Sequence, residues 1–184
     1  MFARTQRLTL RPGWIEDAPA LEAAIAFPEV AFKLSRLPWP YTRAHAEQWL
    51  ARTVPHDEVT LLVFAHEPPA LRLIGGVGIH PTETGRELGY WLTPSAWGRG
   101  YATEAGRAIL GIARHAIGLR RLEAGHFVDN PASGRVLTKL GFRPTGQIAQ
   151  RPCIALGAAR ASVEMALDLD EGETGDDKPA RLAA

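Results

Sequence analysis

Hydrophobic and polar positions alternate along several short segments of the chain, which predicts strands with one buried face. The first example is residues 5–11, where Leu8 and Leu10 stand between polar neighbours. Other β-rich segments of similar length are bounded by turn residues, as strands usually are. The predicted strands cover residues 5–11, 59–65, 71–80, 87–93, 121–127, 142–149 and 162–169.

Four other segments carry apolar residues at helical spacing. Asp17 and Thr42 precede the first two of these segments and suit the N-cap position, and Gly141 suits a C-cap after the last. The predicted helices cover residues 18–27, 43–53, 101–117 and 131–140.

The order of these elements predicts the fold class. Antiparallel hairpins come first, and a strand–helix–strand crossover follows them. This order favours a mixed α/β fold, with a mostly antiparallel central sheet of about seven strands flanked by helices. Between the first two helices, Pro28, Pro38 and Pro40 interrupt regular structure and leave a loop that carries Trp39 and Tyr41.

Length, composition and charge narrow the class of protein. The chain has 184 residues, 46% of them hydrophobic, which fits one domain over residues 1–169. Residues 170–184 are charged and nearly free of large apolar groups, so they predict a disordered tail. The net charge of +1 gives no reason to expect nucleic-acid or membrane binding.

The cellular compartment and the absence of a metal are further expectations. No apolar run reaches the length of a membrane span, and the N-terminus has no apolar signal core. The single cysteine, Cys153, excludes an internal disulfide and suits a reducing compartment, so we expect a cytoplasmic protein. The six histidines and one cysteine show no metal-ligand spacing, and no metal is expected.

Residues 86–104 predict an anion-binding site, because a strand runs there into a glycine-bearing turn and then into a helix. Gly98 and Gly100 allow consecutive N–H groups to point into one concavity. The following helix adds unpaired N–H groups and roughly half a positive charge. A phosphate or pyrophosphate suits such a site. The segment matches neither the Walker loop nor the dinucleotide fingerprint.

The sequence of this segment closely resembles the acyl-coenzyme A pyrophosphate loop of the GNAT N-acetyltransferases. It reads Trp97-Gly98-Arg99-Gly100-Tyr101-Ala102-Thr103-Glu104-Ala105. The resemblance is to the RimJ/RimL-like branch in particular, which includes ribosomal-protein alanine and serine N-acetyltransferases. It extends to residues 5–12, 87–92, 129–133 and 139–142 and so covers about residues 5–169. Trp97 departs from the family, which usually has Gln or Arg there.

The resemblance implies the acyl-CoA N-acyltransferase fold, with the fourth and fifth strands splayed to admit acetyl-CoA as the co-substrate. It also implies a set of cofactor-binding residues from these strands, the loop and the following helix. They are Trp91, Leu92, Thr93, Gly98, Arg99, Gly100, Tyr101, Ala102, Thr103, Asn130, Ser133 and Arg135. The alternative for Trp91, which lies on a central strand, is a position in the hydrophobic core. The alternative for Arg99 and Arg135 is a solvent-exposed basic surface.

The proton donor for the departing thiolate is expected at the start of the last helix. Many GNAT enzymes carry a tyrosine acid in this helix, where this chain has Leu137. In the RimJ/RimL-like branch, a serine at the position of Ser133 is the usual substitute, and the resemblance gives Ser133 that role. Helix capping is the alternative role of both Asn130 and Ser133.

The general base has two candidates. Glu87 is the first, since it opens the fourth strand in a pattern similar to the base-bearing strand of GNAT histone acetyltransferases. His126 is the second, because it lies near the end of the fifth strand and has a suitable ordinary pKa. A surface ion pair for Glu87 and simple packing for His126 are the alternatives. The branch's own glutamate base, in the loop after the sixth strand, is matched here by Pro152.

The expected function is transfer of an acetyl group from acetyl-CoA to a primary amine, by direct transfer in a ternary complex. The acceptor is expected to be a protein or peptide N-terminal amine, with Trp39 and Tyr41 lining its groove. An amino acid, polyamine or aminoglycoside is the alternative acceptor, although the sequence shows no acidic cluster outside the tail. A non-catalytic acyl-CoA sensor is a third hypothesis, and a homodimer is also considered.

Overall fold

The computed structural model describes residues 1–67 and 69–170. The strands are β1 (Ala3–Arg4), β2 (Leu8–Arg11), β3 (Val59–Glu67), β4 (Ala70–Pro81), β5 (Arg86–Leu92), β6 (Arg121–Phe127), β7 (Arg143–Cys153) and β8 (Ala158–Asp168). The α-helices are α1 (Ala18–Ile25), α2 (Pro28–Ala31), α3 (Arg43–Ala51), α4 (Tyr101–Ile112) and α5 (Pro131–Lys139). The expected tail lies, apart from Asp170, outside the described residues.

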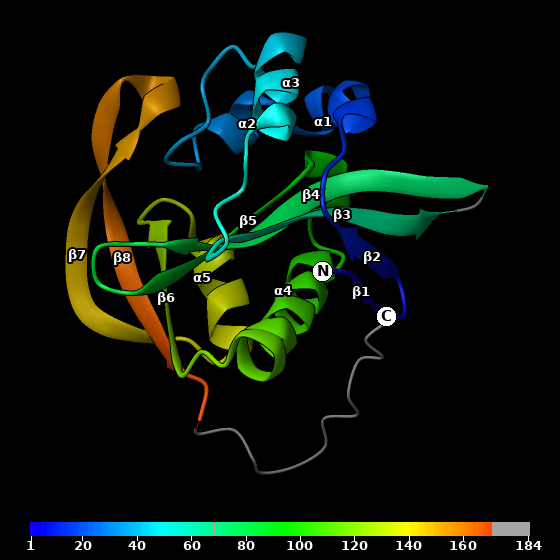
Figure 1. Cartoon of the computed structure of the whole chain (residues 1–184). Coiled ribbons are helices and arrows are strands. Elements are labelled where there is room, and N and C mark those ends of the chain that lie inside the picture. The colour runs from blue at the N-terminus through cyan, green and yellow to red at the C-terminus, as the bar shows by residue number, and fades with distance from the viewer. Residues whose placement is uncertain (68, 171–184) are drawn as a thin grey trace.

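A single mixed sheet organises the fold, which confirms the predicted α/β class. Its eight strands in the described part of the chain are ordered β1-β2-β3-β4-β5-β6-β8-β7. Helices α1, α2 and α3 cover one face of this sheet, and α4 and α5 cover the other (Figure 1). We call the first the groove face and the second the helix face. The short β1, which pairs with β2, is an addition to the predicted strands.

The strand alternation read from the sequence divides the core between the two faces. Leu8 and Leu10 are fully buried and belong to the larger hydrophobic cluster, which includes the buried residues of α4. Leu62 and Phe64 point the other way and pack against α1 and α3. Burial of such side chains at about 25 cal/mol per Å² provides the main stabilisation of both layers.

The sheet is split between β5 and β6, as the resemblance implies for the fourth and fifth predicted strands. These two strands run parallel and form one residue pair, Glu87 with Glu123. Within the part of the chain that the structure describes, no other residue of β5 pairs with a strand on this side, whereas its other edge pairs with β4 along its whole length. The split therefore leaves most backbone N–H and C=O groups on this edge of β5 without a strand partner.

Most helix boundaries agree with the prediction. Thr42 begins α3 in a capping box with His45, whose Nδ1 accepts from the Thr42 N–H at 3.2 Å. Helix α4 continues in a π-helical turn, Ala113–Ile117, up to Gly118 at φ 75°. Gly141 is predicted to follow the end of the last helix. It follows α5 with a φ of 94°, the left-handed conformation in which glycine commonly ends a helix.

Of two predictions near the N-terminus, one is wrong and the other is confirmed in position only. Pro28 begins the short helix α2 rather than a loop, because its fixed φ and missing N–H suit the first helical position. Asp17 stands before α1, but its side chain makes no capping hydrogen bond there. Its carboxylate instead receives two hydrogen bonds of 2.7 Å from Arg11 on β2.

The last two strands are longer than predicted, and they form a hairpin at the edge of the sheet. The register pairs Pro152 with Ala159, so Pro152 lies in a strand and not in a loop. Proline is tolerated there because β7 is an edge strand. Cys153 ends β7 and is 1% exposed. Most residues of β7 are exposed, so this strand lacks the alternation that marks a half-buried strand.

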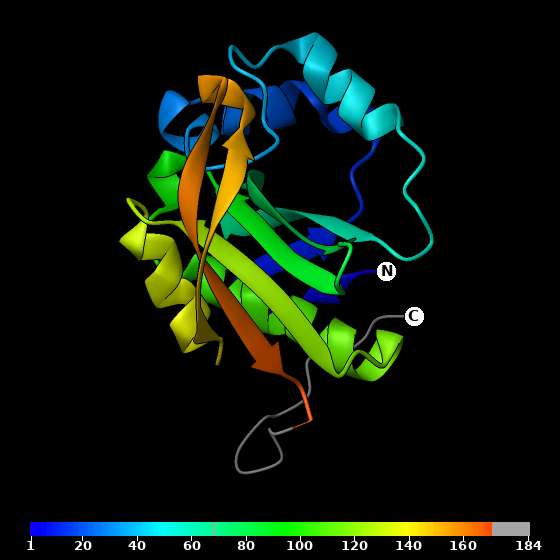
Figure 2. The same ribbon diagram turned by 90° about the vertical axis from the view of Figure 1, so that its left-hand side faces the viewer.

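The β7–β8 hairpin extends beyond the sheet to the layer of α1, α2 and α3 (Figure 2). The N–H of Ile154 donates to the carbonyl of Ser35 at 3.1 Å. Arg160 donates to the carbonyl of Phe32 at 2.6 Å. These contacts fix the loop between α2 and α3 above the groove face.

Candidate active site

The loop between β5 and α4 has the geometry of an anion site. Gly98 and Gly100 have φ of 73° and 80°, conformations that side chains other than glycine rarely adopt. Within the described residues, neither glycine N–H donates to a carbonyl or side chain. Gly100 is the N-cap of α4, so the unpaired N–H groups of the first helical turn adjoin them.

Arg7, at the turn before β2, holds this loop in place. Its guanidinium donates to the carbonyl of Arg99 at 3.0 Å and to Glu104 of α4 at 2.7 Å. Glu104 also accepts from the Thr5 hydroxyl at 2.6 Å. Sequence reasoning missed this role of Arg7, because it depends on a contact between residues more than ninety positions apart.

Several of the expected cofactor residues have their side chains engaged within the protein. The Tyr101 ring is buried, and the guanidinium groups of Arg7 and Arg99 lie 4.7 Å and 4.9 Å from its centroid. Arg99 also pairs with Glu67 at 3.1 Å. Thr93 is 5% exposed, and its N–H donates to Ile74 at 2.8 Å. These residues can therefore offer backbone groups, rather than free side chains, to an anion.

The unusual residue of the loop, Trp97, has an internal partner. Its indole N–H donates to the carbonyl of Leu92 at 2.8 Å, and 44% of the residue is exposed. The tryptophan thus fixes the start of the loop against the end of β5. Trp97 thus stands where the family usually has a polar residue and makes an internal contact instead. Gly98 and Gly100, which follow it, still allow the loop to form a concavity.

A cleft of about 2130 Å³ surrounds the split in the sheet. On the helix face, its walls include Gly98, Gly100 and the start of α5. On the groove face, they include Tyr41, Trp49 and the exposed side of β4 and β5. The cleft therefore connects the candidate anion loop with an open groove on the opposite side of the sheet.

Ser133 lies on the helix face at the split and is joined to Tyr90 of β5. The Tyr90 hydroxyl lies 2.7 Å from Ser133 Oγ and 3.1 Å from the Ser133 carbonyl. Burial raises the pKa of Tyr90 to about 12, although the hydrogen bond to Ser133 opposes this change. Tyr90 thus remains a neutral hydroxyl at physiological pH. The sequence alone gives no sign of this role of Tyr90, because the pairing depends on how α5 packs against β5.

Asn130 and Arg135 occupy the same region of α5. Asn130 is the N-cap, and its side chain accepts weakly from the Ser133 N–H at 3.4 Å. The capping role considered for Asn130 is therefore present, whereas Ser133 does not cap α5. Arg135 is exposed and lines the cleft.

His126 is placed on the helix face and not in the groove. It alternates with Leu122 and Ala124, which are buried against α4 and α5. Its Nδ1 lies 3.0 Å from the carbonyl of Phe127. A Cβ added at Gly134 would stand 2.7 Å from Nε2, so the imidazole packs on the first turn of α5.

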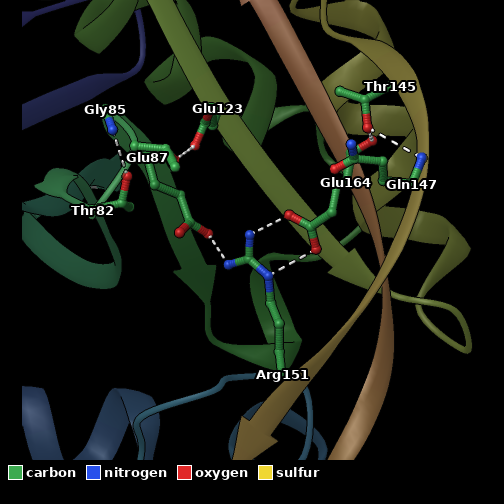
Figure 3. Close-up of polar contacts among 9 residues, drawn as sticks. Thr82, Gly85, Glu87, Glu123, Thr145, Gln147, Arg151 and Glu164 are labelled. Atoms are coloured by element: carbon green, nitrogen blue, oxygen red, sulfur yellow. Dashed lines mark hydrogen bonds and ion pairs between the residues drawn. The ribbon is translucent and has the colours of Figure 1, made fainter.

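Glu87 is placed on the groove face, where Arg151 binds it (Figure 3). Arg151 comes from β7 and also donates to Glu164 of β8, with its Nε 2.8 Å from that carboxylate. Hydrogen bonding to Glu164 and the charge of Glu87 raise the pKa of Arg151 above its already high ordinary value, although burial opposes this change. The ion pair considered for Glu87 is thus present, and it links both sides of the split.

The groove face also gathers acidic residues that are far apart in the sequence. Glu87, Glu123 and Glu164 come from β5, β6 and β8, and all three line the cleft. Arg151 binds two of these carboxylates, Glu87 and Glu164, so this arrangement joins acidic groups through a shared arginine. Spacing along the chain could not reveal it, because strand pairing brings these residues together.

Two flat aromatic rings cover glycine positions on the floor of the groove. A Cβ at Gly76 would stand 2.6 Å from the indole nitrogen of Trp91. A Cβ at Gly78 would stand 2.9 Å from Nε2 of His80. Trp91, expected among the cofactor contacts, thus packs on the groove face with the cluster of α1 and α3. The glycines allow both rings to lie close to the sheet.

Of the two aromatic residues expected to line the acceptor groove, one lines it and the other does not. Tyr41 lines the cleft, and burial raises its pKa to about 12, with a smaller contribution from Glu22. Trp39 is not among the lining residues. It is 36% exposed and packs edge-on against Phe32 at 6.1 Å between ring centroids. The loop turns this tryptophan away from the groove.

Other classes of site receive no support from the geometry. Within residues 1–67 and 69–170, no group of three or more potential metal ligands lies close together. No helix in the described part of the chain is long and apolar enough to cross a membrane. The anion loop and the two-sided cleft are the features that remain to be explained.

The fold and this split site are those of an acyltransferase, and comparison with known proteins agrees. The sequence profile of the Acetyltransferase (GNAT) domain matches residues 7–143. The chain therefore belongs to the GNAT acetyltransferase family, whose co-substrate is acetyl-CoA. The loop fits that co-substrate, since its glycine-lined N–H groups and the α4 terminus suit a diphosphate.

Two relatives from Bacillus illustrate the range of sequence similarity. An uncharacterized N-acetyltransferase of B. subtilis (strain 168), YoaA, is 37% identical over 81 residues, which cover 42% of this chain and 46% of that protein. The chain thus matches about half the length of this relative. The uncharacterized N-acetyltransferase p20 of B. licheniformis is 29% identical over 77% of this chain and 82% of its own length.

Solved structures share the fold over nearly the whole chain. An acetyltransferase (GNAT family) from Bacillus anthracis has a TM-score of 0.79 and 21% identity, and the match covers 93% of this chain and all of that one. RimJ from Mycobacterium smegmatis, in complex with CoA-disulfide, has a TM-score of 0.75 and 22% identity over 91% and 84% of the two chains. At these identities the likeness shows the fold alone.

Proposed function

We propose that this protein moves the acetyl group of acetyl-CoA directly to the N-terminal amine of a protein or peptide, in a ternary complex of the RimJ/RimL-like kind. The observation that carries the proposal is the two-sided cleft. Its anion loop opens on the helix face, and its groove opens on the opposite face. Its volume of about 2130 Å³ exceeds the roughly 300–1,000 Å³ of ordinary small-ligand pockets. A co-substrate and a chain-like acceptor can therefore meet at the split.

The coenzyme half of the site has three roles for residues of this chain. The N–H groups of the loop bind the diphosphate, and the free edge of β5 accepts the pantetheine amides. Acetyl-CoA supplies the thioester. The hydroxyl of Ser133 donates a proton to the departing sulfur, and Tyr90 holds this hydroxyl at 2.7 Å. In this proposal His126 supports α5 by packing and takes no part in the proton transfer.

The acceptor half uses charge to receive an ammonium group. Glu87 binds the ammonium through Oε2, because its Oε1 already accepts from Arg151. Tyr41 lines the groove opposite and limits the space around the acceptor. An N-terminal amine is favoured over a lysine amine, because its deprotonation at pH 7 costs about 1.4 instead of 4.6 kcal/mol.

A panel of acceptors tests this proposal, with thiol release from acetyl-CoA as the measurement. Short peptides with a free N-terminus should be acetylated at that amine, as mass spectrometry would locate. The same peptides with a blocked N-terminus and an internal lysine should react at least tenfold more slowly. Glu87→Gln should raise KM for the free peptide more than it lowers kcat, because it removes a binding charge.

A small cationic amine is the second candidate acceptor, and the carboxylates of Glu87, Glu123 and Glu164 on the cleft wall favour it. Such an acceptor would bind less tightly as salt increases, because exposed charge pairs are screened. Activity confined to di- and polyamines, with no peptide acetylated, would refute the peptide proposal. In that case Glu123→Gln should weaken the polyamine reaction, whereas the peptide proposal leaves Glu123 without a direct role.

A further inference from the structure

His80 is a histidine of the groove face that the roles above leave unused. It lies on β4, where Val77 and Ile79 point into the helix-face core and His80 points the other way. The strand register places it directly beside Glu87 of β5. It lines the cleft, and its side chain is about one-third exposed, at 31%. A ligand in the groove can therefore reach it.

The imidazole turns back over the sheet toward the split. A Cβ added at Gly89 of β5 would lie 3.6 Å from Cδ2 and 3.7 Å from Nε2 of His80. A Cβ added at Gly78 of β4 would lie nearer, 2.9 Å from Nε2, so the ring lies over the Gly78–Gly89 pair of β4 and β5. The distance between neighbouring strands is about 4.8 Å, so His80 stands roughly one strand away from the free edge of β5.

Glu58 fixes the orientation of this imidazole. Its Oε1 lies 3.3 Å from His80 Nδ1. The same carboxylate accepts from Arg52 at 2.6 Å and from the Thr60 hydroxyl at 2.7 Å, so it cannot turn freely. A carboxylate at Nδ1 favours the tautomer with hydrogen on that nitrogen. Nε2, on the cleft side, then carries the lone pair.

The charges around His80 keep it available as a base. Burial lowers the pKa of His80 below its ordinary 6.5, and Arg36 and Arg52 act in the same direction. Glu58 opposes them. Glu87 is the register partner of His80 on the adjacent strand, and its Oε1 accepts from Arg151. The imidazole is therefore mainly neutral at pH 7.

We infer that His80 is the general base of this site and that Glu58 is its positioning residue. This inference rests on the proposed amine acceptor in the groove. Nε2 accepts one proton from the acceptor ammonium. The C–N bond then forms between the amine and the acetyl carbon as the C–S bond breaks. The nitrogen loses a second proton to water, Ser133 gives one to sulfur and regains it from water, and the imidazolium releases its proton to solvent.

The pH dependence of kcat tests the inference with a short free-N-terminus peptide as the acceptor. For the wild type, kcat should fall on the acid side with an apparent pKa below 6.5 that belongs to His80. His80→Gln should lower kcat about a hundredfold, within the usual range for a lost general base, and abolish this acid limb. Glu58→Gln should move the limb to lower pH, because Glu58 raises the pKa of His80.

Controls separate this role from a structural one. Calorimetric titration should show unchanged acetyl-CoA binding by His80→Gln, and circular dichroism should show the same fold. His115→Gln, at an exposed position after α4, should retain the wild-type profile. An NMR titration of the wild-type imidazole should give the same pKa as the kinetic limb. A His80→Gln variant with wild-type kcat and an intact acid limb would overturn the inference.

A second reaction keeps the test independent of the peptide proposal. Slow hydrolysis of acetyl-CoA, with water in place of the amine, needs the same proton acceptor. If no peptide is acetylated, the proposed acceptor is wrong, and the hydrolysis rate still compares His80→Gln with the wild type. Hydrolysis that loses its acid limb in the variant supports the inference. Hydrolysis with the same rate and limb in both proteins contradicts it.

Discussion

Replacing Gly100 by valine should weaken acetyl-CoA binding while the neighbouring residues of the loop stay in place. Gly100 precedes α4 at φ 80°, and its N–H group faces the proposed diphosphate site. A Cβ at this position would lie 3.5 Å from Nη2 of Arg7, an ordinary contact distance. The two further methyl groups of valine, however, would occupy space beside the loop N–H groups. The binding site should therefore lose the close approach that glycine allows.

Two effects of this substitution can be estimated separately. A left-handed conformation costs a residue with a Cβ roughly 1–2 kcal/mol, so Gly100→Val should lower the free energy of unfolding by about 2 kcal/mol. Loss of the diphosphate contact should weaken binding at least tenfold, which corresponds to about 1.4 kcal/mol. Arg99→Ala should cost less binding, because Arg99 is already paired with Glu67 and the backbone donors remain.

Gly118→Val is the matched control for backbone strain. Gly118 has φ 75° at the end of the π-helical turn that follows α4, and a Cβ there would meet nothing within 4 Å. Urea unfolding should show similar destabilisation of the two variants, and calorimetric titration should show weaker acetyl-CoA binding by Gly100→Val alone. Equal binding by Gly100→Val and the wild type would place the diphosphate elsewhere and refute this account of the loop.

Two more predictions follow from the hydrogen-bonded pairs of the cleft. Tyr90→Phe should lower kcat about tenfold with little change in acetyl-CoA affinity, and it should have almost no further effect in a Ser133→Ala background, because the two hydroxyls act together. Burial alone would raise the pKa of Glu58, but hydrogen bonds from Arg52 and Thr60 lower it to about 2 from 4.5. The hydrogen bonds of the Glu58 carboxylate therefore stabilise the fold above pH 4.5, and this contribution is lost as pH falls toward 2. The stability difference between the wild type and Glu58→Gln, up to about 3 kcal/mol at pH 7 in urea unfolding, should shrink over that range.

The sequence predicted the parts of this protein that depend on local physics. Strand alternation around Leu8 and Leu10, helical spacing and the Thr42 cap all reflect interactions within a few residues. The anion loop is predictable for the same reason, since Gly98 and Gly100 stand where a strand passes into a helix. Even here, Trp97 could not be placed, because its partner is a backbone carbonyl of β5.

The acceptor side could be predicted only in part, because it is made by strand register and not by spacing. Glu87 and His80 are seven positions apart, and only the β4–β5 pairing sets them side by side. Gly76, Gly78 and His80 are spaced two residues apart on a predicted strand, so the sequence does predict that they share one face. The contact between His80 and Glu58 could not be predicted from the sequence, because it depends on the path of the chain between α3 and β3.

The split itself explains why the candidate chemistry gathers where it does. One β5–β6 residue pair cannot hold two halves of a sheet together, so side chains must cross the opening. Tyr90 with Ser133 crosses it on the helix face, and Arg151 with Glu87 crosses it on the groove face. A thioester entering between these links meets a hydroxyl pair on one side and carboxylates with His80 on the other. The proposed proton donor, Ser133, and the proposed proton acceptor, His80, thus lie on opposite faces of the sheet, and the acetyl group would pass between them at the split.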